Sequence, residues 1–192
     1  SSPYHNMAEE GGPPPLKLIV VEPNFYTSLD DLRYKLGLES CRQAAKHGIR
    51  LILVDASPLE EVRTGLENAG KDDKGRGFVK VILQISKGKK GSALREVIQE
   101  ACTEMQNGII AFQELEKVDM FRHWHPLVRH MMATESDVTV LRRAAALFQS
   151  TYPIEQYHCE TLANMYFDSL GCTFYTSDSA DELTPRTLDG VR

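Results

Sequence analysis

Five short apolar runs, separated by segments with helical spacing, constrain this chain more than any other feature of its sequence. The runs cover residues 16–21, 49–54, 78–85, 109–112 and 137–141. Runs that are apolar at nearly every position predict strands that are covered on both faces. Because these strands alternate with helices, we expect a three-layer α/β/α fold with a mainly parallel, Rossmann-like sheet.

Helix-start signals precede two of the segments between the strands. Ser28 and Asp31 have a spacing similar to a capping box, which predicts a helix that ends near Lys46. Ser57 followed by Pro58 predicts a second helix, with the Ser57 side chain as its cap.

The composition is that of an ordinary globular domain, with 192 residues of which 42% are hydrophobic and 26% charged. We expect one domain over residues 16–172, between a flexible N-terminal segment (1–15) and a polar C-terminal tail (173–192). The net charge of −5 argues against nucleic-acid binding. The apolar runs are too short to cross a membrane.

The four cysteines are widely spaced and form no CxxC pair, so neither a zinc knuckle nor a redox motif is indicated. Reduced thiols and the absence of a signal-peptide pattern predict a cytoplasmic protein. The sequence leaves the oligomeric state open and allows a homo-oligomer.

Polar residues follow the expected strands at the points where the strands end. The carboxyl ends of parallel strands meet at one edge of a sheet, where ligands bind. We therefore expect the following groups to converge: Glu22 to Asn24, Asp55, the turn at residues 87–96, residues 114–117, and Arg142 with Arg143.

The turn at residues 87–96 reads KGKKGSALRE and brings four positive charges to the start of an expected helix. Free backbone N–H groups and the helix dipole both favour an anion there. Two interpretations remain open from these residues alone, a phosphate site or a solvated basic turn. The position of the turn between Asp55 and the pair Glu114 and Glu116 favours a role facing a diphosphate.

Four segments at these strand ends have the order and spacing of one known family. Residues 22–26 read EPNFY, residues 54–58 read VDASP, residues 88–95 read GKKGSALR, and residues 136–143 read SDVTVLRR. Taken together they resemble the nucleotide-binding half of family 2-like GT-A glycosyltransferases, a group that includes the dolichol-phosphate mannose synthases. The resemblance covers residues 16–143 and implies a GT-A type of sheet.

The resemblance implies a nucleotide-sugar substrate and transfer of its sugar to an unknown acceptor. It implies nucleotide contacts for residues at three strand ends: Pro23, Asn24, Asp55, Ser57, Lys90, Gly91 and Arg95. Of these, Lys90 and Arg95 would face phosphate oxygens. The residues themselves leave alternatives open, since Asp55 could cap a helix and Arg95 could be a surface charge paired with an acid.

The family has an Asp-x-Asp metal site after its next strand, and this chain has Glu114 and Glu116 at that place, with Lys117 beside them. Two carboxylates at a strand end can bind Mg²⁺ or Mn²⁺ together with substrate phosphates. Lys117 could instead supply the positive charge in place of a metal, or pair with Glu114. A divalent-metal site, a metal-free polar site and plain solvated charge all remain open.

A helix is expected over residues 153–170, and its first turns carry Glu155 and His158 on one face. A carboxylate or an imidazole there could remove the proton from an acceptor hydroxyl. The alternative is an ordinary helix with an acidic first turn and a half-buried histidine.

The sequence thus predicts a glycosyltransferase-like protein that binds a nucleotide-sugar. Two alternatives stand beside it. One is a non-catalytic GT-A-like binding protein that has lost the metal site. The other is a different phosphate-handling α/β enzyme.

Overall fold

A computed structural model describes residues 17–86, 90–134, 139, 149–150 and 153–169. The chain divides into two compact units, Ser1–Val128 and Arg129–Arg192. The division falls inside the domain that the sequence predicts over residues 16–172. The predicted N-terminal segment and C-terminal tail lie outside the described residues.

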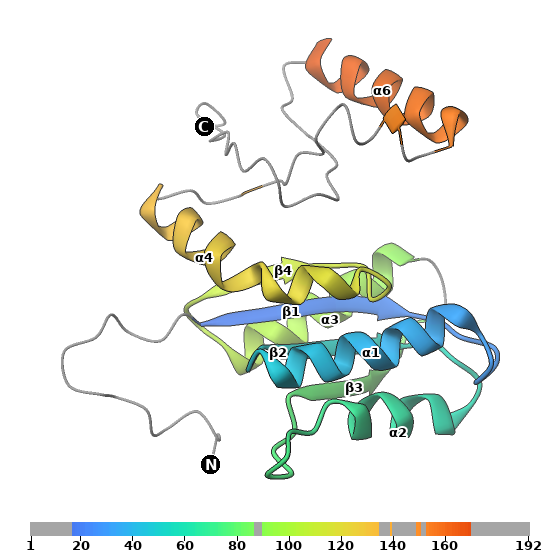
Figure 1. The fold of residues 1–192 in the computed structure, drawn as a ribbon, viewed down its shortest axis with the longest axis vertical. Coiled ribbons are helices and arrows are strands. Elements are labelled where there is room, and N and C mark those ends of the chain that lie inside the picture. The colour runs from blue at the N-terminus through green and yellow to red at the C-terminus, as the bar shows by residue number, and fades with distance from the viewer. Residues whose placement is uncertain (1–16, 87–89, 135–138, 140–148, 151–152, 170–192) are drawn as a thin grey trace. The chain divides into compact units, whose positions relative to one another are not determined.

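The first unit contains a four-stranded sheet in which all strands are parallel (Figure 1). The strands are β1 (Leu18–Asn24), β2 (Arg50–Asp55), β3 (Val79–Leu83) and β4 (Ile109–Phe112). Their order in the sheet is β3-β2-β1-β4. This arrangement confirms the predicted α/β class and its parallel sheet. The predicted strand at residues 137–141 lies outside the described residues, apart from Thr139.

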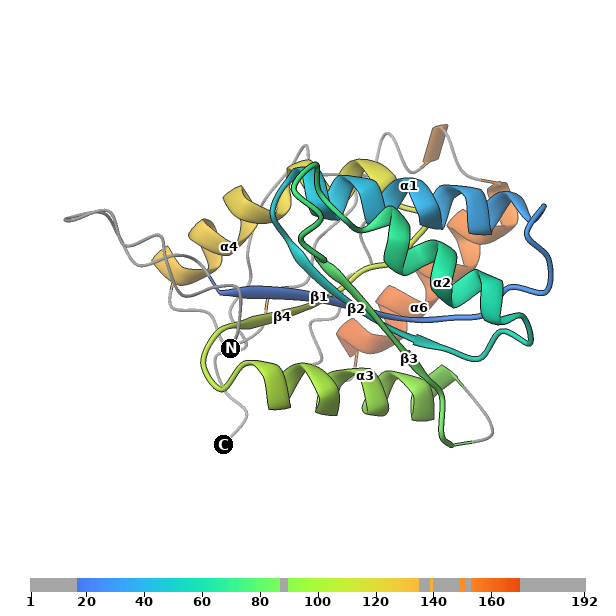
Figure 2. The same ribbon diagram turned by 90° about the horizontal axis from the view of Figure 1, so that it is seen from below.

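Helices α1 (Leu32–Lys46) and α2 (Glu60–Ala69) lie on one face of the sheet, and α3 (Lys90–Glu104) lies on the other (Figure 2). Each of these three helices connects two successive parallel strands. After β4, the chain forms a 3₁₀ helix, η1 (Val118–Arg122), and then α4 (Trp124–Ala133), which runs across the division between the units.

The second unit contains α6 (Ile154–Ser169), which confirms the helix that the sequence predicts over residues 153–170. No helix in the described part of the chain has the length and apolar content that crossing a membrane requires.

The core explains why the strands are apolar at almost every position. Alternate residues of β1 and β2 pack against α3, in a cluster of Ile19, Val21, Ile52, Val54, Ala93, Val97 and Ala101. The intervening residues Val20, Leu51 and Leu53 point to the opposite face, which α1 and α2 cover, and they are fully buried as well. Both faces of these strands therefore exclude water, as the continuous apolar runs predict.

Strand β1 is longer than the sequence predicts. The prediction that residues 22–24 end the strand is wrong, because Pro23 pairs with Val54 and Asn24 with Asp55 in the register with β2. On its other side, β1 pairs with β4 only as far as Val21. The last three residues of β1 thus extend beyond β4, and this extension forms part of the site described below.

The helix starts also differ from the prediction. The N-cap of α1 is Asp31, whose carboxylate accepts a hydrogen bond from the Arg33 backbone N–H. The N-cap of α2 is Leu59 and not Ser57. Ser57 does not cap the helix because its hydroxyl bonds to Asp55 and to the Tyr26 backbone N–H, on a neighbouring strand end.

Candidate functional site

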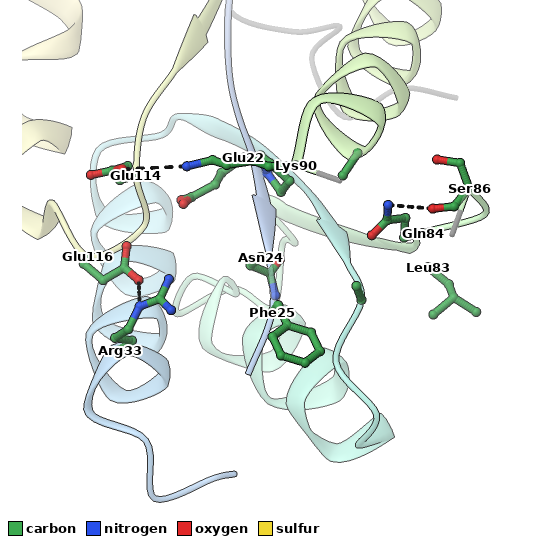
Figure 3. A pocket seen from close by; sticks show the side chains of 13 residues that line it. Glu22, Asn24, Phe25, Arg33, Leu83, Gln84, Ser86, Lys90, Glu114 and Glu116 are labelled. Atoms are coloured by element: carbon green, nitrogen blue, oxygen red, sulfur yellow. Dashed lines mark hydrogen bonds and ion pairs between the residues drawn. The ribbon is translucent and has the colours of Figure 1, made fainter. Parts of the chain in front are cut away.

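A pocket of about 670 Å³ lies at the carboxyl edge of the sheet in the first unit (Figure 3). Its walls come from the end of β1, the segments that follow β2, β3 and β4, and the first turns of α1 and α3. Strands β2 and β3 are added on one side of β1, and β4 is added on its other side. The direction of strand addition therefore reverses at β1, and the pocket lies at this point. Ligands of parallel α/β sheets bind at such reversal points.

Glu22 on β1 is a buried carboxyl in the wall of this pocket, with 4% of its surface exposed. Burial raises its pKa to about 9, and the negative charges of Glu116 and Glu114 add to this effect. Lys90 and a hydrogen bond with the Leu115 backbone oppose it. Because the charged form is disfavoured, Glu22 is a neutral carboxylic acid at pH 7.

The two glutamates that follow β4 each pair with a basic residue. The Arg33 Nε lies 2.6 Å from Glu116 Oε1, and the Lys90 Nζ lies 3.8 Å from Glu114 Oε1 (Figure 3). The Lys90 ammonium also lies 5.6 Å from the centre of the Phe112 ring, within the range of a cation–π contact. These pairs balance the charge of both carboxylates at the mouth of the pocket.

Asp55, at the end of β2, joins three structural elements. Its Oδ1 accepts hydrogen bonds from the Asn24 amide (2.7 Å) and the Ser57 hydroxyl (2.5 Å), and its Oδ2 pairs with Arg63 of α2 (3.1 Å). The residue is fully buried. These contacts make Asp55 a structural link between the strand ends, and its role as a nucleotide ligand stays a prediction.

The segment after β3 is held against α3 by Glu96. This carboxylate accepts hydrogen bonds from the backbone N–H groups of Ile85 (2.9 Å) and Ser86 (2.8 Å) and from the Ser86 hydroxyl. The Gln84 amide donates to the Ser86 carbonyl at 2.7 Å. The backbone therefore enters the basic turn in a defined position, although residues 87–89 of that turn lie outside the described residues.

The structure brings together five of the residues that the sequence assigns to the site. The pocket wall contains Pro23, Asn24, Lys90, Glu114 and Glu116.

Asp55, Ser57, Gly91, Arg95 and Lys117 are not among the lining residues. Arg95 is exposed on α3, where helix rotation places it away from Lys90 and Ala93.

The predicted catalytic pair, Glu155 and His158, lies on α6 in the second unit, and both residues are exposed. Their role as a general base stays a prediction. Arg142 and Arg143 lie outside the described residues.

Among the described residues, no group of three or more His, Cys, Asp and Glu side chains is arranged to hold a metal ion. The role of Glu114 and Glu116 as ligands of Mn²⁺ or Mg²⁺ stays a prediction. The pocket wall thus contains two cations, Arg33 and Lys90, each paired with a carboxylate, together with the acid Glu22 and the side-chain amides of Asn24 and Gln84.

Two important site residues were not assigned a role from the sequence. Glu22 was expected at this edge of the sheet, but nothing in its neighbourhood along the chain signals that it is neutral. Arg33 pairs with Glu116 across 83 positions of sequence, so no local pattern could identify it.

Comparison with protein-family models, with curated proteins and with solved structures gave no match. The resemblance to GT-A glycosyltransferases therefore stays an interpretation of the sequence motifs.

Proposed function

We propose that the first unit binds a nucleotide-sugar in the pocket at the carboxyl edge of its sheet, and that the protein transfers the sugar to an acceptor. The observation that carries this proposal is the pocket's position, at the strand reversal of a parallel sheet and beside the first turn of α3. In folds of this kind, that position is where a diphosphate meets a helix N-terminus.

Lys90 is the residue that we assign to the diphosphate. It begins α3, lines the pocket and holds Glu114 only through a long, exposed ion pair of 3.8 Å. Exposed pairs of this type contribute little to stability. A phosphate group can therefore replace Glu114 as the partner of Lys90 at little cost in free energy.

A second candidate function, binding without catalysis, is favoured by the ion pairs of Glu114 and Glu116. Each carboxylate already has a basic partner, Lys90 or Arg33, so neither needs a metal ion for charge balance. On this alternative, the pocket holds a nucleotide-sugar and no transfer follows.

Thermal unfolding with UDP-glucose, GDP-mannose and CDP-glucose, each with and without Mn²⁺, tests the proposal. A ligand present at 100 times its Kd stabilises the folded state by about 2.7 kcal/mol, which gives a clear rise in Tm. If no nucleotide-sugar raises the Tm, the proposed function is wrong. If a nucleotide-sugar binds but releases no free nucleotide with any acceptor tested, the binding-only alternative holds.

The Lys90→Gln variant examines the assignment of the phosphate contact. We expect nucleotide-sugar affinity to fall about tenfold, because a charge-assisted hydrogen bond contributes roughly 1.5–3 kcal/mol. Lys46→Gln is the matched control, since Lys46 is an exposed lysine at the far end of α1. Equal affinities of the two variants would contradict the assignment.

A further inference from the structure

Two buried side chains at the end of β1 each have an oxygen atom without a hydrogen-bond partner among the described residues. These atoms are Oε2 of Glu22 and Oδ1 of Asn24, in residues that are 4% and 6% exposed. Both residues line the pocket, and their spacing places them on the same face of the strand. Buried polar atoms in proteins nearly always bond to protein or to ordered water, so these two atoms are available to a ligand that displaces water from the pocket.

Asn24 can only accept a hydrogen bond from the ligand. Its amide nitrogen donates to Asp55 Oδ1 at 2.7 Å, and this bond fixes which end of the amide is which. The free end is therefore the carbonyl oxygen, which requires a donor. A phosphate with all its oxygens ionised has no donor, so the diphosphate itself does not satisfy Asn24.

Glu22 can both donate and accept. The charged groups that face it are Glu116, Glu114 and Lys90, and the phenol of Tyr26 and the thiol of Cys41 lie near it as well. Burial and the two glutamates keep its pKa far above the usual range, so it carries its proton at pH 7. A neutral carboxyl presents one O–H donor and further acceptor capacity.

We propose that Glu22 and Asn24 form a subsite that binds hydroxyl groups of a sugar. A hydroxyl group donates one hydrogen bond and accepts others, so hydroxyls satisfy the acceptor of Asn24 and the acid of Glu22. The sugar or the ribose of the ligand then lies over the end of β1, and its phosphates face Lys90. The proposal rests on the proposed function in placing a nucleotide-sugar in this pocket.

The test measures Kd by calorimetry for UDP-glucose, GDP-mannose, inorganic pyrophosphate, and free glucose and mannose at high concentration. Glu22→Met keeps the approximate volume but removes the hydrogen bonds, and we expect it to weaken every sugar-containing ligand about tenfold. Glu22→Gln, which still donates and accepts, should restore affinity to within about threefold. Pyrophosphate affinity should change less than twofold in both variants but fall about tenfold in Lys90→Gln.

The control variant is Glu61→Met, because Glu61 is an exposed glutamate in the first turn of α2. If free sugars bind in a Glu22-dependent way and no nucleotide-sugar binds, the subsite is supported and the proposed function is wrong. If Glu22→Met binds every sugar-containing ligand as the wild type does, or if no sugar-containing ligand binds at all, the subsite is overturned. Binding of Mn²⁺ that Glu22→Gln abolishes would also overturn it, by identifying a cation site.

Discussion

Two carboxyl groups at the ends of adjacent strands are both buried, but they differ in their hydrogen-bond partners and in the charges around them. Asp55 on β2 is fully buried and has partners for both oxygens, from the side chains of Asn24, Ser57 and Arg63. Glu22 on β1 is almost as deeply buried, but one of its oxygens has no partner among the described residues. The groups that face Glu22 include two further carboxylates, Glu114 and Glu116.

This difference shows that the role of an acidic residue at a strand end depends on its hydrogen-bond partners and neighbouring charges, and not on its position in the sheet. Asp55 joins β1, β2 and α2 through its hydrogen bonds and its ion pair, so its role is structural. Glu22 is neutral and faces the pocket, so it is available to a ligand. Three substitutions would break or sharpen this comparison.

The largest effect is expected for Asp55→Ala. This variant removes the acceptor of two side chains and leaves the Arg63 guanidinium without its ion-pair partner. Breaking this partly buried pair and leaving two buried donors without an acceptor should lower the free energy of unfolding by about 3–4 kcal/mol, measured by urea denaturation followed by circular dichroism. Asp73→Ala, in an exposed loop, is the control. A loss below about 1 kcal/mol would show that Asp55 is not a structural link.

Glu22→Gln should change the free energy of unfolding in the opposite direction: we expect this variant to be more stable than the wild type at neutral and alkaline pH. The folded-state pKa of about 9 lies above the usual 4.5, so the native state keeps a proton that the unfolded state releases. Wild-type stability therefore falls as the pH rises from about 4.5 to about 9. Glutamine does not titrate, so the variant does not lose stability in this pH range. The wild type loses at most about 1.4 kcal/mol of its free energy of unfolding per pH unit.

We expect the variant to gain about 1–3 kcal/mol at pH 8 and almost nothing at pH 4, in urea denaturation at several pH values. Glu61→Gln provides the baseline, since Glu61 is exposed. A difference between variant and wild type that is the same at every pH would show that Glu22 is not neutral in the folded protein.

The smallest effect is expected for Glu116→Gln. Of the two glutamate charges that raise the pKa of Glu22, that of Glu116 has the larger effect, so its removal should lower that pKa. The loss of its ion pair with Arg33, which is largely exposed, should change stability by less than about 1 kcal/mol. Carbon-13 NMR titration of the Glu22 carboxyl measures the change in pKa. Glu39→Gln is the control, because Glu39 also has an arginine partner, Arg42, but does not line the pocket. A rise in the pKa would contradict the electrostatic explanation.

Much of the fold could be predicted because its signals are local. The apolar runs at residues 49–54 and 109–112 correspond closely to β2 and β4. The end of β1 could not be predicted locally, since Pro23 and Asn24 continue the strand only through their register with β2. Ser57 has the features of a helix cap, yet its hydroxyl bonds to Asp55 and to the Tyr26 backbone instead.

The location of the candidate site could be predicted from the sequence, but only some of its residues could. The rule that parallel strands end at one edge correctly placed Asn24, Lys90 and Glu114 in a common pocket. The partner of Glu116 was not predictable, because Arg33 is distant in sequence. Arg95 has a good local motif, but the rotation of α3 keeps it out of the pocket wall.

The sequence alone determined the α/β class, the parallel sheet and the edge at which polar groups gather, because hydrophobic periodicity and chain connectivity are local properties. Only the tertiary structure decided that Asp55 has protein partners for both oxygens and that Glu22 is a neutral acid facing the pocket. The protonation of Glu22 depends on its burial and on the charges of Glu114 and Glu116, which follow a different strand. For that reason the residue that we assign to sugar recognition is one whose chemistry the sequence could not reveal.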